Sequence, residues 1–190
     1  MTFAEHYRTA CGDVLAELTT TLNRIDPDSL EKLVDAILNA EQVFFVGVGR
    51  VMLSLQAVCK RLAHLGVRTH YVGEITEPAI TKNDLLIVGS GSGGSLFPLG
   101  IAKKARSVAD CTIVHIGSNP ESEMKDICDF MVRVPVRTKL YLEDEIESCQ
   151  PMTSLFEQSL LLLGDILAKI IMERKGLDMK ALWHCHANLE

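Results

Sequence analysis

Short apolar runs and helical patterns alternate along most of this 190-residue chain. Runs of roughly four to eight apolar residues are typical of buried strands, whereas apolar residues at every third or fourth position predict amphipathic helices. The expected strands are 43–48, 67–72, 85–88, 111–116 and 130–134, and the expected helices among them are 50–65, 95–108 and 121–127. Such alternation indicates parallel βαβ units. The pattern therefore predicts five parallel strands with helices on both faces.

The two ends of the chain add helices outside this alternation. Residues 3–23 carry apolar side chains at helical spacing, and Asp26 before Pro27 is a typical start for a second helix, with Asp26 as its N-cap. A long helix is expected over 155–175, because Gly176 is a natural stop directly after it.

One polar and acidic segment, 137–150, interrupts the pattern and is predicted to be an exposed loop. The sequence contains no internal repeat and no linker. We therefore expect a single α/β domain over residues 1–190, a three-layer α/β/α sandwich with N-terminal helices at 3–40 and a C-terminal helix plus tail at 153–190.

Composition narrows the class of protein. The chain is 47% hydrophobic and 23% charged, as in an ordinary globular domain, and its net charge of −6 argues against a nucleic-acid partner. We expect no membrane partner either, because no apolar run approaches spanning length and the N-terminus lacks a signal-peptide profile. The six cysteines form no Cys-x-x-Cys pair, and several lie in strand- or helix-like apolar surroundings, which favours reduced, buried cysteines and a cytoplasmic protein.

The apolar run at 85–88 ends abruptly in a segment of glycine and serine, Gly89-Ser90-Gly91-Ser92-Gly93-Gly94-Ser95, before a helical pattern resumes. Glycine lets the backbone approach a ligand, serine hydroxyls donate hydrogen bonds, and the N–H groups of a helix N-terminus attract anions. A polar turn with one N-cap serine is the simpler interpretation. The repetition favours a phosphate-binding loop, with Ser90, Gly91, Ser92 and Ser95 as candidates.

A second glycine-containing strand exit lies at Gly47-Val48-Gly49-Arg50. Ligands of open α/β sheets bind beyond the carboxyl ends of the strands, where the strand order reverses. This segment resembles half of a dinucleotide fingerprint, with Glu74 as a possible ribose-binding acid, but Met52 stands where a third glycine is needed. A nicotinamide cofactor would also leave the serines unexplained, so we expect no cofactor.

Glu157 admits two interpretations. Ser154-Leu155-Phe156-Glu157 fits a capping box, in which the carboxylate only bonds the start of its own helix. Its apolar neighbours also predict partial burial, which suits a general base.

Other polar residues carry weaker signals. His184 and His186 flank Cys185, which invites a zinc hypothesis, but alternate residues share a metal only in an extended segment and no further ligand cluster is nearby. We expect no metal site and regard an exposed tail histidine as the simpler interpretation. Arg137 and Lys139 are equally consistent with surface charge.

Taken together, these segments resemble the sugar isomerase (SIS) domain family, and within it the 6-phospho-3-hexuloisomerase branch. The matching motifs run through nearly the whole chain and are found at 46–50, 61–66, 72–80, 90–93, 118–122, 134–139, 150–157 and 186–190. The resemblance implies a flavodoxin-like five-stranded sheet and a homodimer or homotetramer with sites shared between subunits.

The resemblance also implies a reaction, the cofactor-free interconversion of 6-phospho-3-hexulose and fructose 6-phosphate through a cis-enediolate. That reaction belongs to the ribulose monophosphate pathway of formaldehyde fixation or, in reverse, to pentose supply. The implied catalytic residues are Glu157 and His186, and the implied substrate- and phosphate-binding residues are Gly49, Arg50, Ser90, Gly91, Ser92 and Ser95.

Two positions depart from the family pattern. Val51 stands where a serine is usual in the first loop, and Gly94 replaces a glutamate in the second. Ser54, one helical turn after Arg50, is a poorly placed substitute for the missing hydroxyl. These departures leave two alternatives open: a non-catalytic module that senses a phosphosugar, and an isomerase for a different phosphosugar.

Overall fold

Five short strands pair in parallel to form one sheet with the order β2-β1-β3-β4-β5. The computed structural model describes residues 1–189, so Glu190, the last residue of the 186–190 motif, lies outside the described residues. The strands are β1 (Val43–Val46), β2 (Thr69–Tyr71), β3 (Leu85–Gly89), β4 (Thr112–Gly117) and β5 (Phe130–Arg133). Five parallel strands were predicted, and this prediction is confirmed.

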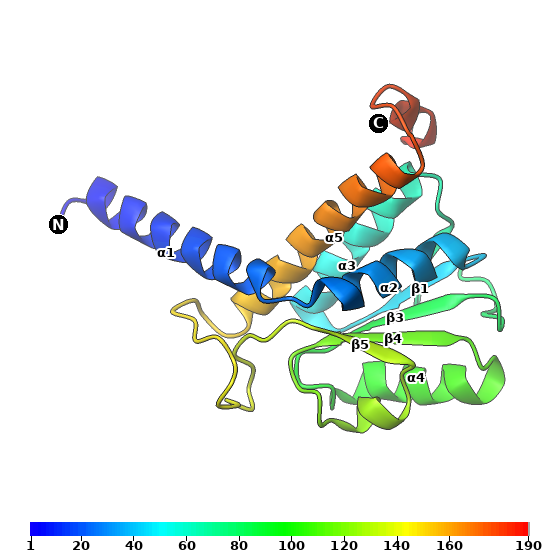
Figure 1. Cartoon of the computed structure of the whole chain (residues 1–190), viewed down its shortest axis with the longest axis horizontal. Helices are drawn as coiled ribbons and strands as arrows, with labels where there is room; N and C mark the ends of the chain where they lie inside the picture. Colours follow the sequence, from blue (N-terminus) through cyan, green and yellow to red (C-terminus); the bar gives the residue numbers. More distant parts are fainter. Residues whose placement is uncertain (190) are drawn as a thin grey trace.

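Helices cover both faces of the sheet (Figure 1). One face carries α2 (Pro27–Asn39), α3 (Gly49–His64) and α5 (Ser154–Arg174), and the other carries α4 (Leu96–Val108) with the short 3₁₀ turn η1 (Glu123–Asp126). The helix α1 (Phe3–Asn23) extends from the body like an arm, and a second 3₁₀ turn, η2 (Ala181–Cys185), follows α5. The α/β architecture with helices on both faces is therefore as expected.

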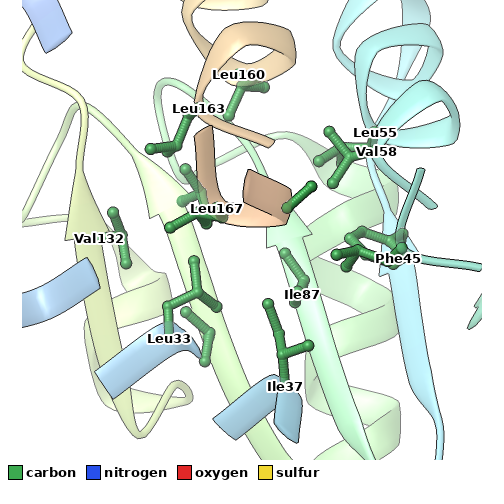
Figure 2. Close-up of a cluster of buried hydrophobic side chains, with 14 of the residues drawn as sticks. Leu33, Ile37, Phe45, Leu55, Val58, Ile87, Val132, Leu160, Leu163 and Leu167 are labelled. Carbon is green, nitrogen blue, oxygen red and sulfur yellow. The ribbon is translucent and has the colours of Figure 1, made fainter. Parts of the chain in front are cut away.

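Alternation along the central strands builds two cores. In β1, Val43 and Phe45 face the side of α3 and α5, while Phe44 and Val46 face α4. Successive side chains of a strand point to opposite faces, so a fully apolar strand serves both layers. Figure 2 shows the larger core, in which side chains from α2, α3 and α5 meet the sheet.

The acidic loop is where the expectation of an exposed segment is wrong in part. Glu143, Asp144 and Glu147 are exposed as expected, but Glu145 is only 8% exposed. A carboxylate is tolerated in such a position when several donors bond it. Its donors come from the loop itself and from the end of β4, so the segment folds around Glu145.

The cysteines and the helices bear on two further expectations. All six cysteines are unpaired; Cys59 and Cys111 are buried, whereas Cys11, Cys149 and Cys185 are exposed, so the expected burial holds for only some of them. Within residues 1–189, no helix is both long and apolar enough to cross a membrane.

Candidate functional site

A cavity of about 400 Å³ opens at the carboxyl ends of β1 and β3. The chain leaves β1 toward β2 on one side and enters β3 on the other, so the strand order reverses between these two strands. The cavity is lined by Val48, Gly49, Arg50, Val51, Gly89, Ser90, Gly91, Ser92, Ser95, Thr138, Lys139, Met152, Thr153, Phe156 and Glu157. Of the predicted site residues, only His186 is missing from this lining.

Glycines allow the first helix of the site to lie close to the sheet. A Cβ added to Gly89 would lie 2.7 Å from Leu55 Cδ1 and 3.0 Å from Val51 Cγ1, and one added to Gly47 would lie 3.2 Å from the same two atoms. Gly49 has a φ of +56°, which only glycine adopts readily. These glycines therefore place the start of α3, with Arg50, at the edge of the cavity.

The serine loop is held by bonds from neighbouring strands. The buried ring of His115 bonds the Ser90 carbonyl oxygen through Nε2 at 2.8 Å, and the Ser118 N–H donates to the Gly91 carbonyl at 2.9 Å. Because the carbonyl accepts, Nε2 is the protonated nitrogen. Burial lowers the pKa of His115, and the bond to Ser90 opposes this shift. These two hydrogen bonds therefore fix the backbone of the serine loop on the side that faces away from the cavity.

The N-cap interpretation of these serines is right about the position of Ser95 but wrong about a side-chain capping bond. Ser95 occupies the N-cap position of α4, but its side chain makes no capping bond, and its hydroxyl oxygen instead accepts from Ser90 Oγ at 3.4 Å. Hydroxyls that do not cap the helix remain available to a ligand in the cavity.

Three helices begin at the cavity, and none has a side-chain cap. The N-cap residues of α3, α4 and α5 are Val48, Ser95 and Thr153, and within the described chain none bonds its helix through its side chain. Away from the cavity, Thr2 and Asp26 cap α1 and α2 with side-chain oxygens. Backbone N–H groups at uncapped N-termini attract anions, so the cavity is suited to a phosphate.

Glu157 does not form the capping box. Ser154 lies inside α5 rather than at its N-cap, and the carboxylate points to the cavity, where Oε1 accepts from Thr153 Oγ1 at 2.9 Å and Oε2 accepts from Arg50 Nε. Glu157 is 7% exposed, whereas the Arg50 side chain is 65% exposed. Glu157 is therefore a buried carboxylate at the cavity, paired with a cation that remains exposed.

The two departures from the family pattern occupy different surroundings. Val51 lines the cavity and packs against Gly89, so its methyl groups replace a hydroxyl at the site itself. Ser54 donates to the Glu157 carbonyl at 2.8 Å, outside the cavity lining, and does not replace that hydroxyl. Gly94 is exposed, with no atom within 4 Å of an added Cβ, and does not line the cavity.

His186 lies far from Glu157 within one chain. It follows η2 and its ring stacks on His64 at a centroid distance of 5.0 Å, at the end of α3 opposite to Arg50. A helix of 16 residues is roughly 24 Å long. The chain by itself does not bring the two predicted catalytic residues together.

Thr138, Lys139, Met152, Thr153 and Phe156 also line the cavity but were not predicted as site residues. Sequence signals for the first four were weak, because they lie in irregular segments with no periodicity, whereas Phe156 lies in α5 and looked like an ordinary apolar helix residue. The motif at 134–139 was the one available signal for Lys139. Glu74, the residue considered for a ribose, instead bonds His70 Nδ1 at 2.6 Å and does not line the cavity.

Comparison with known proteins finds relatives over nearly the full length, although no protein-family profile matches. The chain is 38% identical to a 3-hexulose-6-phosphate isomerase of Bacillus subtilis over 179 residues, covering 94% of this chain and 96% of that protein. A crystal structure from Methanococcus jannaschii, from which the function of a 3-hexulose-6-phosphate isomerase was inferred, has a TM-score of 0.78 at 31% identity and covers 98% of this chain and 99% of that one.

A more distant structure shares the fold alone. The NanR protein of Vibrio vulnificus, complexed with ManNAc-6P, has a TM-score of 0.74 at 18% identity, covering 93% of this chain and 66% of that one. The same fold therefore occurs in a protein that holds a phosphorylated amino sugar.

Proposed function

The chain belongs to the SIS-domain family of phosphosugar isomerases, and we propose that it interconverts 6-phospho-3-hexulose and fructose 6-phosphate. One observation carries this proposal: a buried carboxylate, Glu157, and an uncapped serine loop face the same cavity of about 400 Å³. That volume suits a small ligand.

The serine loop would bind the phosphate. Ser90, Ser92 and Ser95 supply hydroxyl donors, and the N-terminus of α4 supplies backbone N–H groups and a partial positive charge. Holding the phosphate at one end of the cavity fixes the positions of C2 and C3 of an open-chain sugar relative to Glu157.

Glu157 would act as the general base. Starting from fructose 6-phosphate, its carboxylate removes the proton from C3, and the C3–H electrons form the C2–C3 double bond of a cis-enediolate while the carbonyl oxygen at C2 takes the negative charge. The proton then returns to C2, and the hydroxyl proton on O3 moves to O2. The product is the 3-ketose, with no net gain or loss of electrons.

Arg50 would stabilise the enediolate. Its guanidinium bonds Glu157, and because this side chain is largely exposed it can exchange that partner for a substrate oxygen at little desolvation cost. The departure of Arg50 would leave the carboxylate of Glu157 to accept the proton.

His186 would move the hydroxyl proton, but only in an oligomer. We propose a homodimer or homotetramer in which His186 of one subunit approaches Glu157 of another, because the two residues lie at opposite ends of α3 in a single chain. An imidazole has one nitrogen that donates and one that accepts a proton, which suits transfer between O2 and O3.

The test is proton exchange in deuterated water with purified protein and fructose 6-phosphate. We expect deuterium at C3 and formation of the 3-keto product. Glu157→Gln is expected to lower turnover by about 10²- to 10⁴-fold while fructose 6-phosphate still binds. Full turnover by this variant would show that Glu157 is not the base.

A phosphosugar sensor is the second candidate, favoured by Val51, which replaces a hydroxyl in the cavity lining. A sensor would bind fructose 6-phosphate without any exchange at C3. Exchange with another phosphosugar in place of fructose 6-phosphate would instead indicate an isomerase of different specificity.

A further inference from the structure

The ionisable side chains that line the cavity differ in whether they form ion pairs. Arg50, Lys139 and Glu157 are its ionisable lining residues, and the first and last of these bond each other. Within residues 1–189, the Lys139 ammonium makes no ion pair. A phosphate monoester carries a charge between about −1.5 and −2 at neutral pH. Neutral hydroxyls do not balance that charge, so Lys139 is the cation available to it.

Lys139 lies on a loop whose two ends are joined. Ile146 N–H donates to the Pro135 carbonyl at 2.7 Å, and Arg137 N–H donates to the Ile146 carbonyl at 2.9 Å. The segment 135–146 therefore leaves and re-enters the body of the protein at one place, as an Ω-loop does. A loop closed in this way can hold a side chain at a defined position.

This loop folds around the buried carboxylate of Glu145. Glu145 accepts hydrogen bonds from Ser118 Oγ at 2.8 Å, from Thr138 Oγ1 at 3.0 Å, from Thr138 N–H at 3.1 Å and from Leu142 N–H at 3.0 Å. Two of these donors belong to the residue directly before Lys139, and one comes from the end of β4. A buried carboxylate with four donors fixes the backbone around it.

Thr138 also places this loop beside the serines. A Cβ added to Gly91 would lie 3.1 Å from Thr138 Cγ2, so the loop touches the backbone between Ser90 and Ser92. Glu157 and Arg50 lie on α5 and α3. Lys139 is thus brought in next to the serine loop, the part of the cavity where the phosphate is expected.

We propose that Lys139 binds the phosphate of the substrate and that Glu145 is the positioning residue that holds it there. The identity of the phosphate end rests on the proposed function, but the binding of a phosphate group does not require isomerase activity. The Glu145 clamp acts through Thr138 and touches no substrate.

The experiment measures binding of inorganic phosphate and fructose 6-phosphate by calorimetry in Lys139→Gln and in a matched control, Arg137→Gln. Arg137 carries the same charge two residues away but pairs with the exposed Glu147 and does not line the cavity. We expect the Kd of Lys139→Gln to rise at least about tenfold for both ligands, as for a lost charge-assisted hydrogen bond. Arg137→Gln should stay within about twofold of wild type, and Lys139→Arg should retain most of the affinity.

Kinetics separate binding from catalysis. A phosphate contact made equally in the ground state and the transition state raises KM and leaves kcat nearly unchanged, and this is the expected pattern for Lys139→Gln. Glu145→Ala removes both carboxylate oxygens, so the N–H groups of Thr138 and Leu142 lose their acceptor. It should weaken phosphate binding in the wild-type background and add nothing to the Kd of Lys139→Gln, whereas a purely structural role would affect both backgrounds equally.

Each outcome has one meaning. Unchanged affinity in Lys139→Gln overturns this proposal, even if wild-type protein isomerises fructose 6-phosphate. Phosphate binding that depends on Lys139 in a protein with no exchange at C3 supports it and contradicts the proposed isomerase function. A wild-type protein that binds neither ligand overturns both.

Discussion

At the scale of single residues, His115 lies outside the cavity lining but fixes the backbone of Ser90, which lines the cavity. Its buried ring holds the Ser90 carbonyl, and burial lowers its pKa below the usual 6.5. In the folded protein the His115 ring therefore stays neutral at a pH at which the same ring in the unfolded chain already binds a proton. It is the burial of the ring, not its bond to the Ser90 carbonyl, that favours the neutral imidazole.

This predicts a pH dependence of stability. As pH falls through about 6.5, the unfolded state gains a proton that the folded state does not, so the free energy of unfolding decreases, by up to about 1.4 kcal/mol per pH unit until the folded pKa is reached. Urea denaturation at pH 7.5 and 5.5 measures the loss. In His115→Gln the loss should be smaller, and an equal loss in both proteins would contradict the assignment.

At the scale of elements, the contact between α3 and α5 sets the geometry of the site, because these helices carry Arg50 and Glu157. Gly164 of α5 faces Val58 of α3 so closely that an added Cβ would lie 2.2 Å from Val58 Cγ2. The absence of a side chain at this position lets the two helices approach. Gly100, inside α4, has no atom within 4 Å of an added Cβ.

The two glycines make a matched pair. Gly164→Ala should lower the free energy of unfolding by about 1–3 kcal/mol, because the methyl group overpacks the helix contact. Gly100→Ala should raise it by about 0.5–1 kcal/mol, because alanine favours a helix interior and meets nothing there. Chemical denaturation of both variants measures the difference, and a stabilised Gly164→Ala would show that the helices separate readily.

At the scale of the whole molecule, the arm formed by α1 and the position of His186 both bear on the proposed oligomer. Phe3, Tyr7 and Leu15 are exposed along the arm, which extends beyond the body of the protein (Figure 1). His186 lies at the far end of α3 from its proposed site. In an oligomer, one subunit's tail can approach the cavity of another.

Subunit mixing tests this arrangement. Glu157→Gln and His186→Ala should each be inactive alone, but a re-equilibrated mixture should regain about a quarter of wild-type activity, since half of the dimers are mixed and each has one intact shared site. Turnover assays before and after mixing measure the gain. Sites contained within one chain would give no recovery, and a mixture of either variant with itself is the control.

The sequence by itself determined the sheet, the helices and the serine loop. Strand and helix periodicities are local, and glycine and serine directly after a buried strand indicate a ligand-binding loop at the carboxyl end of that strand. The motifs also placed Glu157 and Arg50 among the candidates. What these residues touch could not be predicted, because the partners come from segments far apart in the chain.

Only the tertiary structure excluded the capping box for Glu157. The local sequence fits such a box, but Ser154 lies inside α5 and the carboxylate of Glu157 bonds Arg50, which is 107 residues away. The burial of Glu145 in the acidic loop was not predicted for a similar reason. The hydroxyls of Ser118 and Thr138 donate hydrogen bonds to its carboxylate, and a hydropathy pattern carries no information about such donors. Whether a charged side chain can be buried depends on the hydrogen-bond partners that the fold brings to it, whereas the periodicity of a helix or strand is a property of its own segment.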